Sequence, residues 1–387
     1  MSWNLIYQFS LLPHFLLTWI VPFLFILTII IFVHELGHFL VARWCGIKVL
    51  AFSIGFGPEL VGFTDRLGTR WKVSLIPLGG YVKFFGDDNA ASVPDTQAIA
   101  AMSPDDKRVS FFHKSVGARA AVVAAGPIAN FLLAIAIFAT LFMIHGKEEI
   151  APRVGELLPG SAAEAAGFKP GDLVLSINGR AIESFEDMQQ IVSLSADDPL
   201  EVLVEREGAK VNLHATPKLT TEKDRFGNVY RRGLLGIKPP ESATKNVRII
   251  KYGPVGAVNA AVKQTWFVVE QTFRYLGRWA IGRASSDQLG GPVRMAQMAR
   301  EAASLGFATL MGLAGLISVS IGLLNLFPIP LLDGGHLLFY GIEAVRGRPL
   351  SERVQEVGFR IGLAIIVMLM IFTVGNDLAH LFHFRAS

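Results

Sequence analysis

Four long runs of apolar residues divide the chain and predict its architecture. They lie at about 15–41, 120–144, 306–332 and 361–374, and the last extends back to about 357. About twenty apolar residues in a helix cross roughly 30 Å of hydrocarbon. We therefore predict four transmembrane helices, the fourth with limits that the pattern alone does not define.

The composition agrees with a membrane protein that carries one soluble insert. Of the 387 residues, 51% are hydrophobic and 18% are charged, whereas about a quarter of an ordinary soluble domain is charged. Basic residues beside the apolar runs explain the net charge of +4, so we expect no nucleic-acid partner. The single cysteine, Cys45, excludes an internal disulfide. No basic segment or cleavage site precedes His34, so we expect the first run to be retained.

The first run contains the sequence His-Glu-Leu-Gly-His at positions 34–38. His34 and His38 share one face of a helix and can bind one metal ion, and Glu35 lies where a carboxylate can act as a general base. Such groups are costly in hydrocarbon and are therefore functional by default. The alternative is two histidines packed in a core, but that alternative leaves a buried Glu35 without a partner.

A catalytic zinc site needs a third protein ligand, and Asp333 is the strongest candidate. Two prolines end the third helix before it, and two glycines after it let the chain turn toward the metal. Asn325 could form a hydrogen bond in the same site. Asp333 could instead cap a helix, although an anion at membrane depth needs a cation. We interpret His336 as a capping or packing residue, with a role beside the metal as the alternative.

The loop after the first run predicts two strands, at 47–63 and 71–85. The stretch 74–84 is too apolar for a free cytosolic loop. We therefore expect a β-hairpin that dips into the lipid bilayer beside the metal and binds an extended substrate by strand addition. The substrate-positioning candidates are Asn325 and, in this hairpin, Gly79, Gly80, Tyr81 and Val82. The alternative is a simple hairpin that caps the membrane surface.

The segment after the second run has the character of a soluble domain. Residues 154–179 predict a strand, a turn, a short helix, a second turn and a strand, and Ser184 is expected to cap a helix that ends near 195. This run resembles a PDZ domain, which implies a groove for a peptide terminus or strand. A domain that only blocks or supports an active site is the alternative. Amphipathic patterning over 250–300 predicts helices on the membrane surface.

The expected fold class is an α-helical polytopic membrane protein with a membrane-associated β-hairpin and one inserted PDZ-like α+β domain. Basic residues after the first run, before the second and between the third and fourth place loops 43–119 and 344–356 in the cytoplasm. Both termini and the insert then lie outside, with the metal toward the cytoplasmic side. The expected divisions are a first transmembrane helix at 1–42, a hairpin loop at 43–119, a second helix at 120–145, the PDZ-like domain at 150–240, surface helices at 250–305, a third helix at 306–343 and a fourth at 357–383.

The order of the motifs resembles that of the site-2 protease family, in its bacterial regulator-of-sigma-E (RseP-like) branch. These motifs are His-Glu-Leu-Gly-His at 34–38, Gly-Gly-Tyr-Val-Lys at 79–83, Ala-Gly-Pro-Ile-Ala-Asn at 125–130, the PDZ-like insert, Gly-Gly-Pro-Val at 290–293 and Asn-x-x-Pro-x-Pro-x-x-Asp-Gly at 325–334. One departure is that enterobacterial members carry two tandem PDZ domains, whereas the spacing here fits one. Gating of the substrate by a PDZ pair is therefore not expected.

The resemblance implies a zinc endopeptidase that cuts single-span membrane proteins, such as an anti-sigma factor, within the bilayer during regulated intramembrane proteolysis. It implies His34, His38 and Asp333 as ligands of one Zn²⁺ and Glu35 as the catalytic base. It also implies residence in the bacterial inner membrane, with the PDZ-like domain in the periplasm. A different class of function is an inactive membrane scaffold that holds protein tails through the PDZ-like domain. A metal transporter would need several intramembrane ligands along a path, and the sequence offers one cluster.

Overall fold

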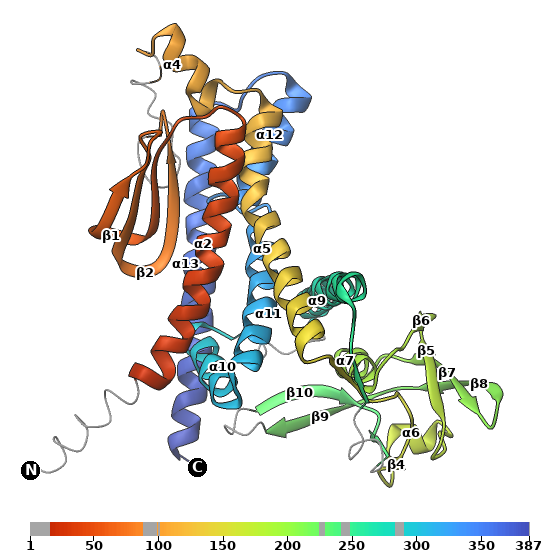
Figure 1. Ribbon diagram of the computed structural model, residues 1–387. Coiled ribbons are helices and arrows are strands. Elements are labelled where there is room, and N and C mark those ends of the chain that lie inside the picture. Colours follow the sequence, from red (N-terminus) through yellow and green to blue (C-terminus); the bar gives the residue numbers. More distant parts are fainter. Residues whose placement is uncertain are drawn as a thin grey trace, which may run out of the picture. The chain divides into compact units, whose positions relative to one another are not determined.

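The computed structural model describes residues 16–87, 99, 101–223, 229–240, 248–282 and 290–386 (Figure 1). The predictions for residues 1–15 therefore lie outside the described part. The chain divides into two compact units, which we describe separately. The first unit combines residues 1–139, 261–269 and 291–375, and the second combines 140–260, 270–290 and 376–387.

Four of the described helices are long and apolar enough to cross a membrane, as predicted. These segments are Leu17–Trp44, Val116–Ile144, Phe307–Asn325 and Arg353–Asp377. The chain is therefore a multi-pass membrane protein. The helices that contain or adjoin these segments are η1 (Leu16–Ile20), α2 (Val21–Trp44), α5 (Val116–Ile144), α10 (Pro292–Leu305), α11 (Phe307–Asn325), α12 (Asp333–Arg346) and α13 (Glu352–Ala386).

Small residues let the helices of the first unit pack closely. A Cβ atom on Gly37 of α2 would overlap the carbonyl oxygen of Ala125 on α5, so only glycine allows this crossing. The buried alanines of α10, such as Ala299, pack against Ile26 and Ile30 of α2 and against α11. These crossings determine how α5 and α10 lie against the helix that carries the histidine motif.

The predicted hairpin consists of β1 (Val49–Thr64) and β2 (Arg70–Phe84). Its pairing is more elaborate than a simple hairpin, because residues 51–54 pair with 80–83 on one side and with 70–73 on the other. The long strands bend near Gly55 and Gly57, both of which have positive φ angles. The two bent strands therefore form four adjacent rows of extended chain, in the order 80–83, 51–54, 70–73 and 61–64. Residues 80–83 form one of the two outer rows.

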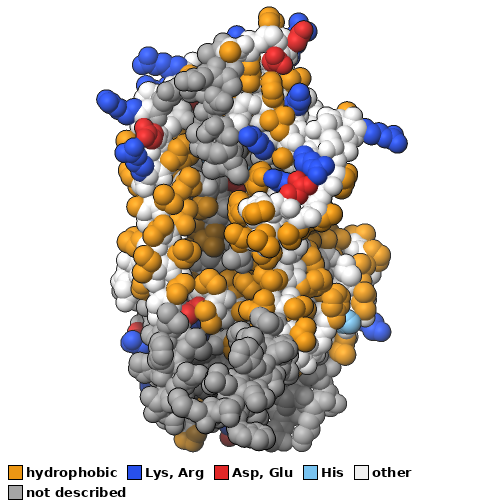
Figure 2. All heavy atoms as spheres, turned by 90° about the vertical axis from the view of Figure 1, so that its left-hand side faces the viewer, with side chains coloured by type: hydrophobic (Ala, Val, Ile, Leu, Met, Phe, Trp, Pro, Cys, Tyr) orange, Lys and Arg blue, Asp and Glu red, His pale blue; other side chains and the backbone are white. Residues whose placement is uncertain are grey.

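The sheet has an apolar surface and a polar attachment to α2. Figure 2 shows hydrophobic side chains spread over the face that carries the sheet, with Lys and Arg gathered toward its upper end. Exposed apolar side chains of the sheet include Leu60, Phe63 and Leu75. Arg43, at the end of α2, donates hydrogen bonds to Asp65 and, at 2.9 Å, to the hydroxyl of Thr69. The turn between the strands is thereby held against the end of the first span.

The second unit contains a four-stranded antiparallel sheet in the order β6-β5-β7-β8. Its helix α7 (Phe185–Leu194) begins with the predicted cap at Ser184, which forms a capping box with Asp187. Buried side chains such as Val174, Ile191 and Val202 form one core between the sheet and its helices. The elements of this unit are β3 (Lys147–Glu149), β4 (Glu156–Leu157), α6 (Ala162–Ala165), β5 (Leu173–Ile177), β6 (Arg180–Ala181), β7 (Leu200–Arg206), β8 (Ala209–Ala215), β9 (Lys218–Lys223), β10 (Val229–Leu234), β11 (Ile237–Lys238), β12 (Arg248–Ile250) and parts of α9 (Pro254–Ala280).

One buried ion pair stabilises this unit. Asp172 is fully buried, and both of its carboxylate oxygens accept hydrogen bonds of 2.8 Å from Arg206. Burial alone would raise the pKa of Asp172, but the bonds from Arg206 and from the Lys169 amide outweigh it and lower the pKa. Because the pKa of Asp172 is lower in the folded state, the ionised carboxylate stabilises the unit fully at pH values above its ordinary pKa of 3.8. This stabilisation is lost as the pH falls from there through the lower pKa of the folded state.

We expect Asp172→Asn to destabilise this unit by about 1.5–3 kcal/mol, because the hydrogen bonds from the partly exposed Arg206 lose their charged acceptor. The measurement is amide hydrogen exchange of β5 and β7 in the full-length protein at neutral pH. Glu156→Gln, which removes the exposed ion pair with Lys238, is the control and should cost less than about 1 kcal/mol. Equal exchange in the two variants would contradict this account.

Candidate metal centre

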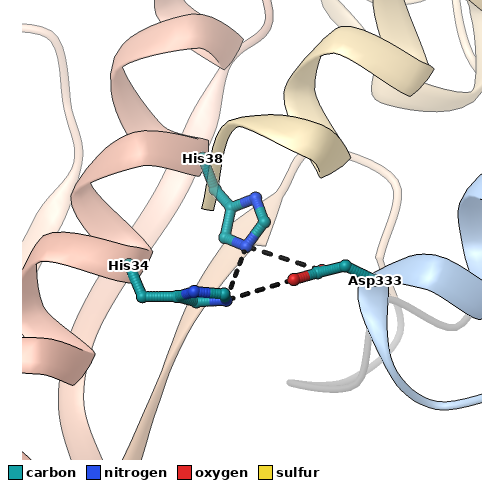
Figure 3. A group of neighbouring side chains, drawn as sticks. All are labelled: His34, His38 and Asp333. Carbon is teal, nitrogen blue, oxygen red and sulfur yellow. Dashed lines mark hydrogen bonds and ion pairs between the residues drawn. The ribbon is translucent and has the colours of Figure 1, made fainter. Parts of the chain in front are cut away.

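Three predicted ligands meet at one point in the first unit (Figure 3). The Nε2 atom of His34 lies 3.1 Å from Asp333 Oδ2, and the Nε2 atom of His38 lies 3.5 Å from Asp333 Oδ1. The two Nε2 atoms are 3.2 Å apart, and the three ligand atoms lie within 4.8 Å of one another. The prediction that Asp333 returns to the histidine motif is therefore confirmed.

The donor set fits a divalent cation. Both histidines are buried, and Asp333 Oδ2 is buried and has no hydrogen-bond partner among the described residues. Two imidazole nitrogens and a carboxylate oxygen thus face one another, and no described residue outside the cluster donates a hydrogen bond to Asp333 Oδ2. Nitrogen and oxygen ligands in this number are typical of a catalytic zinc site.

The segment between α11 and α12 brings Asp333 to the histidines. Helix α11 ends at Asn325, as the prolines predict, and Asp333 is the first residue of α12. The turn itself falls at Leu331, whose φ is 85°, and not at the glycines that follow. Gly334 and Gly335 are helical residues that allow close approach, since a Cβ on Gly335 would lie 2.5 Å from the carbonyl oxygen of Ile329. The prediction that these glycines make the turn is therefore wrong.

A partly buried ion pair holds the far end of α12 to α5. Arg119, in the first turn of α5, donates a hydrogen bond of 2.6 Å to Glu343, and both side chains are 12% exposed. The guanidinium also lies 4.8 Å from the ring centre of Tyr340. These contacts hold the part of α12 that follows Asp333, and so they stabilise the position of the helix that carries this residue.

One row of positions on α5 supports the two histidines. His38 Nδ1 lies 2.9 Å from the carbonyl oxygen of Val122, and His34 Nδ1 lies 3.2 Å from the side-chain amide of Asn130. Between these residues is Gly126, where a Cβ would overlap His38 and lie 2.8 Å from His34 Nε2. Gly126 and Asn130 both belong to the Ala-Gly-Pro-Ile-Ala-Asn motif at 125–130, but the motif alone did not place either residue beside the histidines. The signal for Gly126 was its place in the Ala-Gly-Pro motif.

All predicted site residues line one cavity of about 670 Å³. They are Glu35, His34, His38 and Asp333, with Asn325 and the strand residues Gly79, Gly80, Tyr81 and Val82. A Cβ on Gly80 would lie 3.0 Å from Glu35 Cγ, so the outer row of the sheet approaches Glu35 directly. His336, which we interpreted as a capping or packing residue, also lines the cavity. The roles of these residues in catalysis stay predictions.

We expect Gly126→Ala to lower the affinity for zinc at least tenfold, because the added Cβ displaces the imidazoles from their positions. The measurement is zinc binding by chelator competition on detergent-purified protein. The control is Gly117→Ala on the same helix, where a Cβ meets nothing within 4 Å and binding should not change. Unchanged zinc affinity in Gly126→Ala would show that the helices do not pack this closely.

The chain matches peptidase family M50 over residues 22–369. It is 51% identical to a candidate zinc metalloprotease of Rhizobium meliloti (strain 1021) over 360 residues, 93% of this chain and 96% of that protein. It is 41% identical to metalloprotease MmpA of Caulobacter vibrioides over 381 residues, 93% of this chain and 95% of the relative. Together with the cluster of His34, His38 and Asp333, these matches show that the chain belongs to peptidase family M50, the site-2 protease family, and is a zinc metalloprotease.

Proposed function

We propose that the chain is an endopeptidase that cuts single-span membrane proteins, such as an anti-sigma factor, within the bilayer. The observation that carries this proposal is the position of the metal centre. His34 and His38 lie well inside the apolar helix α2, and the third ligand joins them from beyond the third span. A protease that acts on soluble chains would have no need to place charged and polar groups in hydrocarbon.

The residues of the site divide between metal binding and proton transfer. His34, His38 and Asp333 would hold the zinc ion. Bound zinc supplies a Lewis acid that polarises the scissile carbonyl and lowers the pKa of water. Glu35 takes a proton from the attacking water as the new C–O bond forms, and it passes this proton to the amide nitrogen as the C–N bond breaks.

The outer row of the sheet is the proposed binding site for the substrate backbone. Gly80–Val82 pair with residues 52–54 as an outer row of the sheet, and Gly79–Val82 line the cavity. A transmembrane helix must unwind locally before attack, because its carbonyls are hydrogen-bonded within the helix. An added strand beside Gly80–Val82 would replace those bonds and bring the extended backbone next to Glu35.

The second unit and the orientation complete the proposal. We propose that residues 150–240 form a PDZ-like domain on the periplasmic side of a bacterial inner membrane, where it binds a peptide or controls access to the protease. Support for the orientation comes from the basic residues beside the spans, including Arg43, Arg119 and Arg346. Support for peptide binding comes from the sheet and the capped helix α7, which are elements that such grooves use.

We expect Glu35→Gln to retain zinc and to lower the cleavage rate by roughly 10²–10⁴-fold, because the amide cannot accept the proton from water. The measurement pairs zinc content with cleavage of a reporter that carries one transmembrane segment, and mass spectrometry of substrates trapped in native membranes identifies the natural one. Glu356→Gln, at an exposed site on α13, is the control. Cleavage by Glu35→Gln at the parent rate would remove Glu35 from the mechanism.

We expect Gly80→Ala to lower cleavage at least tenfold while zinc content stays constant. The added Cβ would meet Ile31 and Glu35 and would push the outer row away from the base. A displacement of about 1 Å can cost on the order of 100-fold in rate. Leu75→Ala, at an exposed position of the same sheet, is the control. If Gly80→Ala cleaved like the control, this row would not position the substrate.

A further inference from the structure

The two histidines that face the metal site both use their second ring nitrogen, Nδ1, to contact the same helix, α5. Val122, Gly126 and Asn130 are spaced four residues apart on α5, so they form one row along the helix. Gly126 contributes no side chain, and both imidazole rings pack into the space that a Cβ would fill. The residues on either side of it, Val122 and Asn130, contact His38 and His34 respectively.

The environment of His38 determines which of its nitrogens carries the proton. Its Nδ1 lies 2.9 Å from the Val122 carbonyl oxygen, and a carbonyl can only accept a hydrogen bond. The proton of the neutral ring therefore lies on Nδ1. This leaves the lone pair of Nε2 directed at His34 and Asp333, where a metal ligand is needed.

His34 needs the same arrangement, but its neighbour is a carboxamide. Its Nε2 faces Asp333, so a neutral His34 that binds metal through Nε2 must carry its proton on Nδ1. The amide nitrogen of Asn130 lies 3.2 Å from this Nδ1, and two donors would then face each other. The oxygen and the NH2 group of a carboxamide have nearly the same size. A half-turn about the last side-chain bond therefore exchanges their positions without moving any other atom.

A second observation favours that exchange. Asn130 is fully buried, and its side-chain oxygen has no hydrogen-bond partner among the described residues. Ser318 of α11 donates a bond of 2.8 Å to the backbone carbonyl of Asn130, which fixes this turn of α5 beside the histidine. Turning the amide would give the unsatisfied oxygen the Nδ1 proton of His34.

We propose that Asn130 is a positioning residue whose side-chain oxygen accepts the Nδ1 proton of His34. It thereby fixes the tautomer and the ring orientation that present Nε2 to zinc. Val122 does the same for His38 through its backbone, so α5 sets both rings without binding the metal itself. Outer partners of this kind typically change metal affinity by 10–100-fold. The inference rests on His34 being a metal ligand, as proposed above.

The test measures the dissociation constant for zinc by chelator competition on full-length protein in detergent. Asn130→Leu and Asn130→Ala remove the acceptor, and we expect both to weaken zinc binding 10–100-fold. Asn130→Asp keeps an acceptor of the same size, and we expect its affinity to remain within about threefold of the parent or to increase. Ser320→Ala is the control for loss of a polar group on α11, because its hydroxyl donates to the Leu316 carbonyl of its own helix, and it should change affinity less than twofold.

Two results would overturn the inference. One is parental zinc affinity in Asn130→Leu or Asn130→Ala. The other is a loss in Asn130→Asp as large as in Asn130→Leu, because the contact would then require an amide donor. Thermal unfolding of the metal-free proteins identifies variants that fail to fold, and Asn130→Ala replaces Asn130→Leu where the larger side chain does so. His34→Ala separates the two proposals, since retained zinc there would contradict the ligand set itself.

Discussion

The structure depends on one electrostatic constraint: two imidazoles and a carboxylate lie together in an apolar helix bundle, where leaving them unpaired costs free energy. Without a cation, the two Nε2 atoms and the Asp333 oxygens would face one another as buried groups with too few protons to pair them. Zinc removes this cost because all three can bind it at once. The prolines, the positive φ at Leu331 and the close approach at Gly335 all bring one carboxylate from a distant segment to this point.

Small residues are the second requirement, because helices that share a metal site must lie very close to one another. Gly37 lets α2 contact the backbone of α5, and Gly126 then provides the space in which both rings lie. Gly80 extends the same close packing to the sheet, whose outer row contacts α2 at Ile31 and Glu35. Glu35, the proposed base, therefore lies between the proposed metal ligands and the row proposed to bind the substrate. Hydrophobic side chains complete the bundle, but these three glycines determine its dimensions at the site.

Much of this arrangement could be predicted from the sequence, because its signals are local and chemically distinctive. The lengths of the apolar runs predicted the four helices, and the spacing of the two histidines predicted two of the ligands. The need for a third ligand gave Asp333, although it lies about 300 residues away. The double pairing of residues 51–54 could not be predicted, since strand propensity does not define which rows become neighbours. The role of Gly126 depends on how two helices cross, and no local pattern defines that crossing.

The central claim is that His34, His38 and Asp333 together bind one zinc ion. X-ray absorption at the zinc edge on the purified full-length protein tests it most directly. The account predicts one zinc per chain, with two imidazole nitrogens and carboxylate oxygen at about 2.0–2.2 Å in a four-coordinate shell. A thiolate ligand, which the single cysteine Cys45 would have to supply, or a shell without imidazole would contradict it.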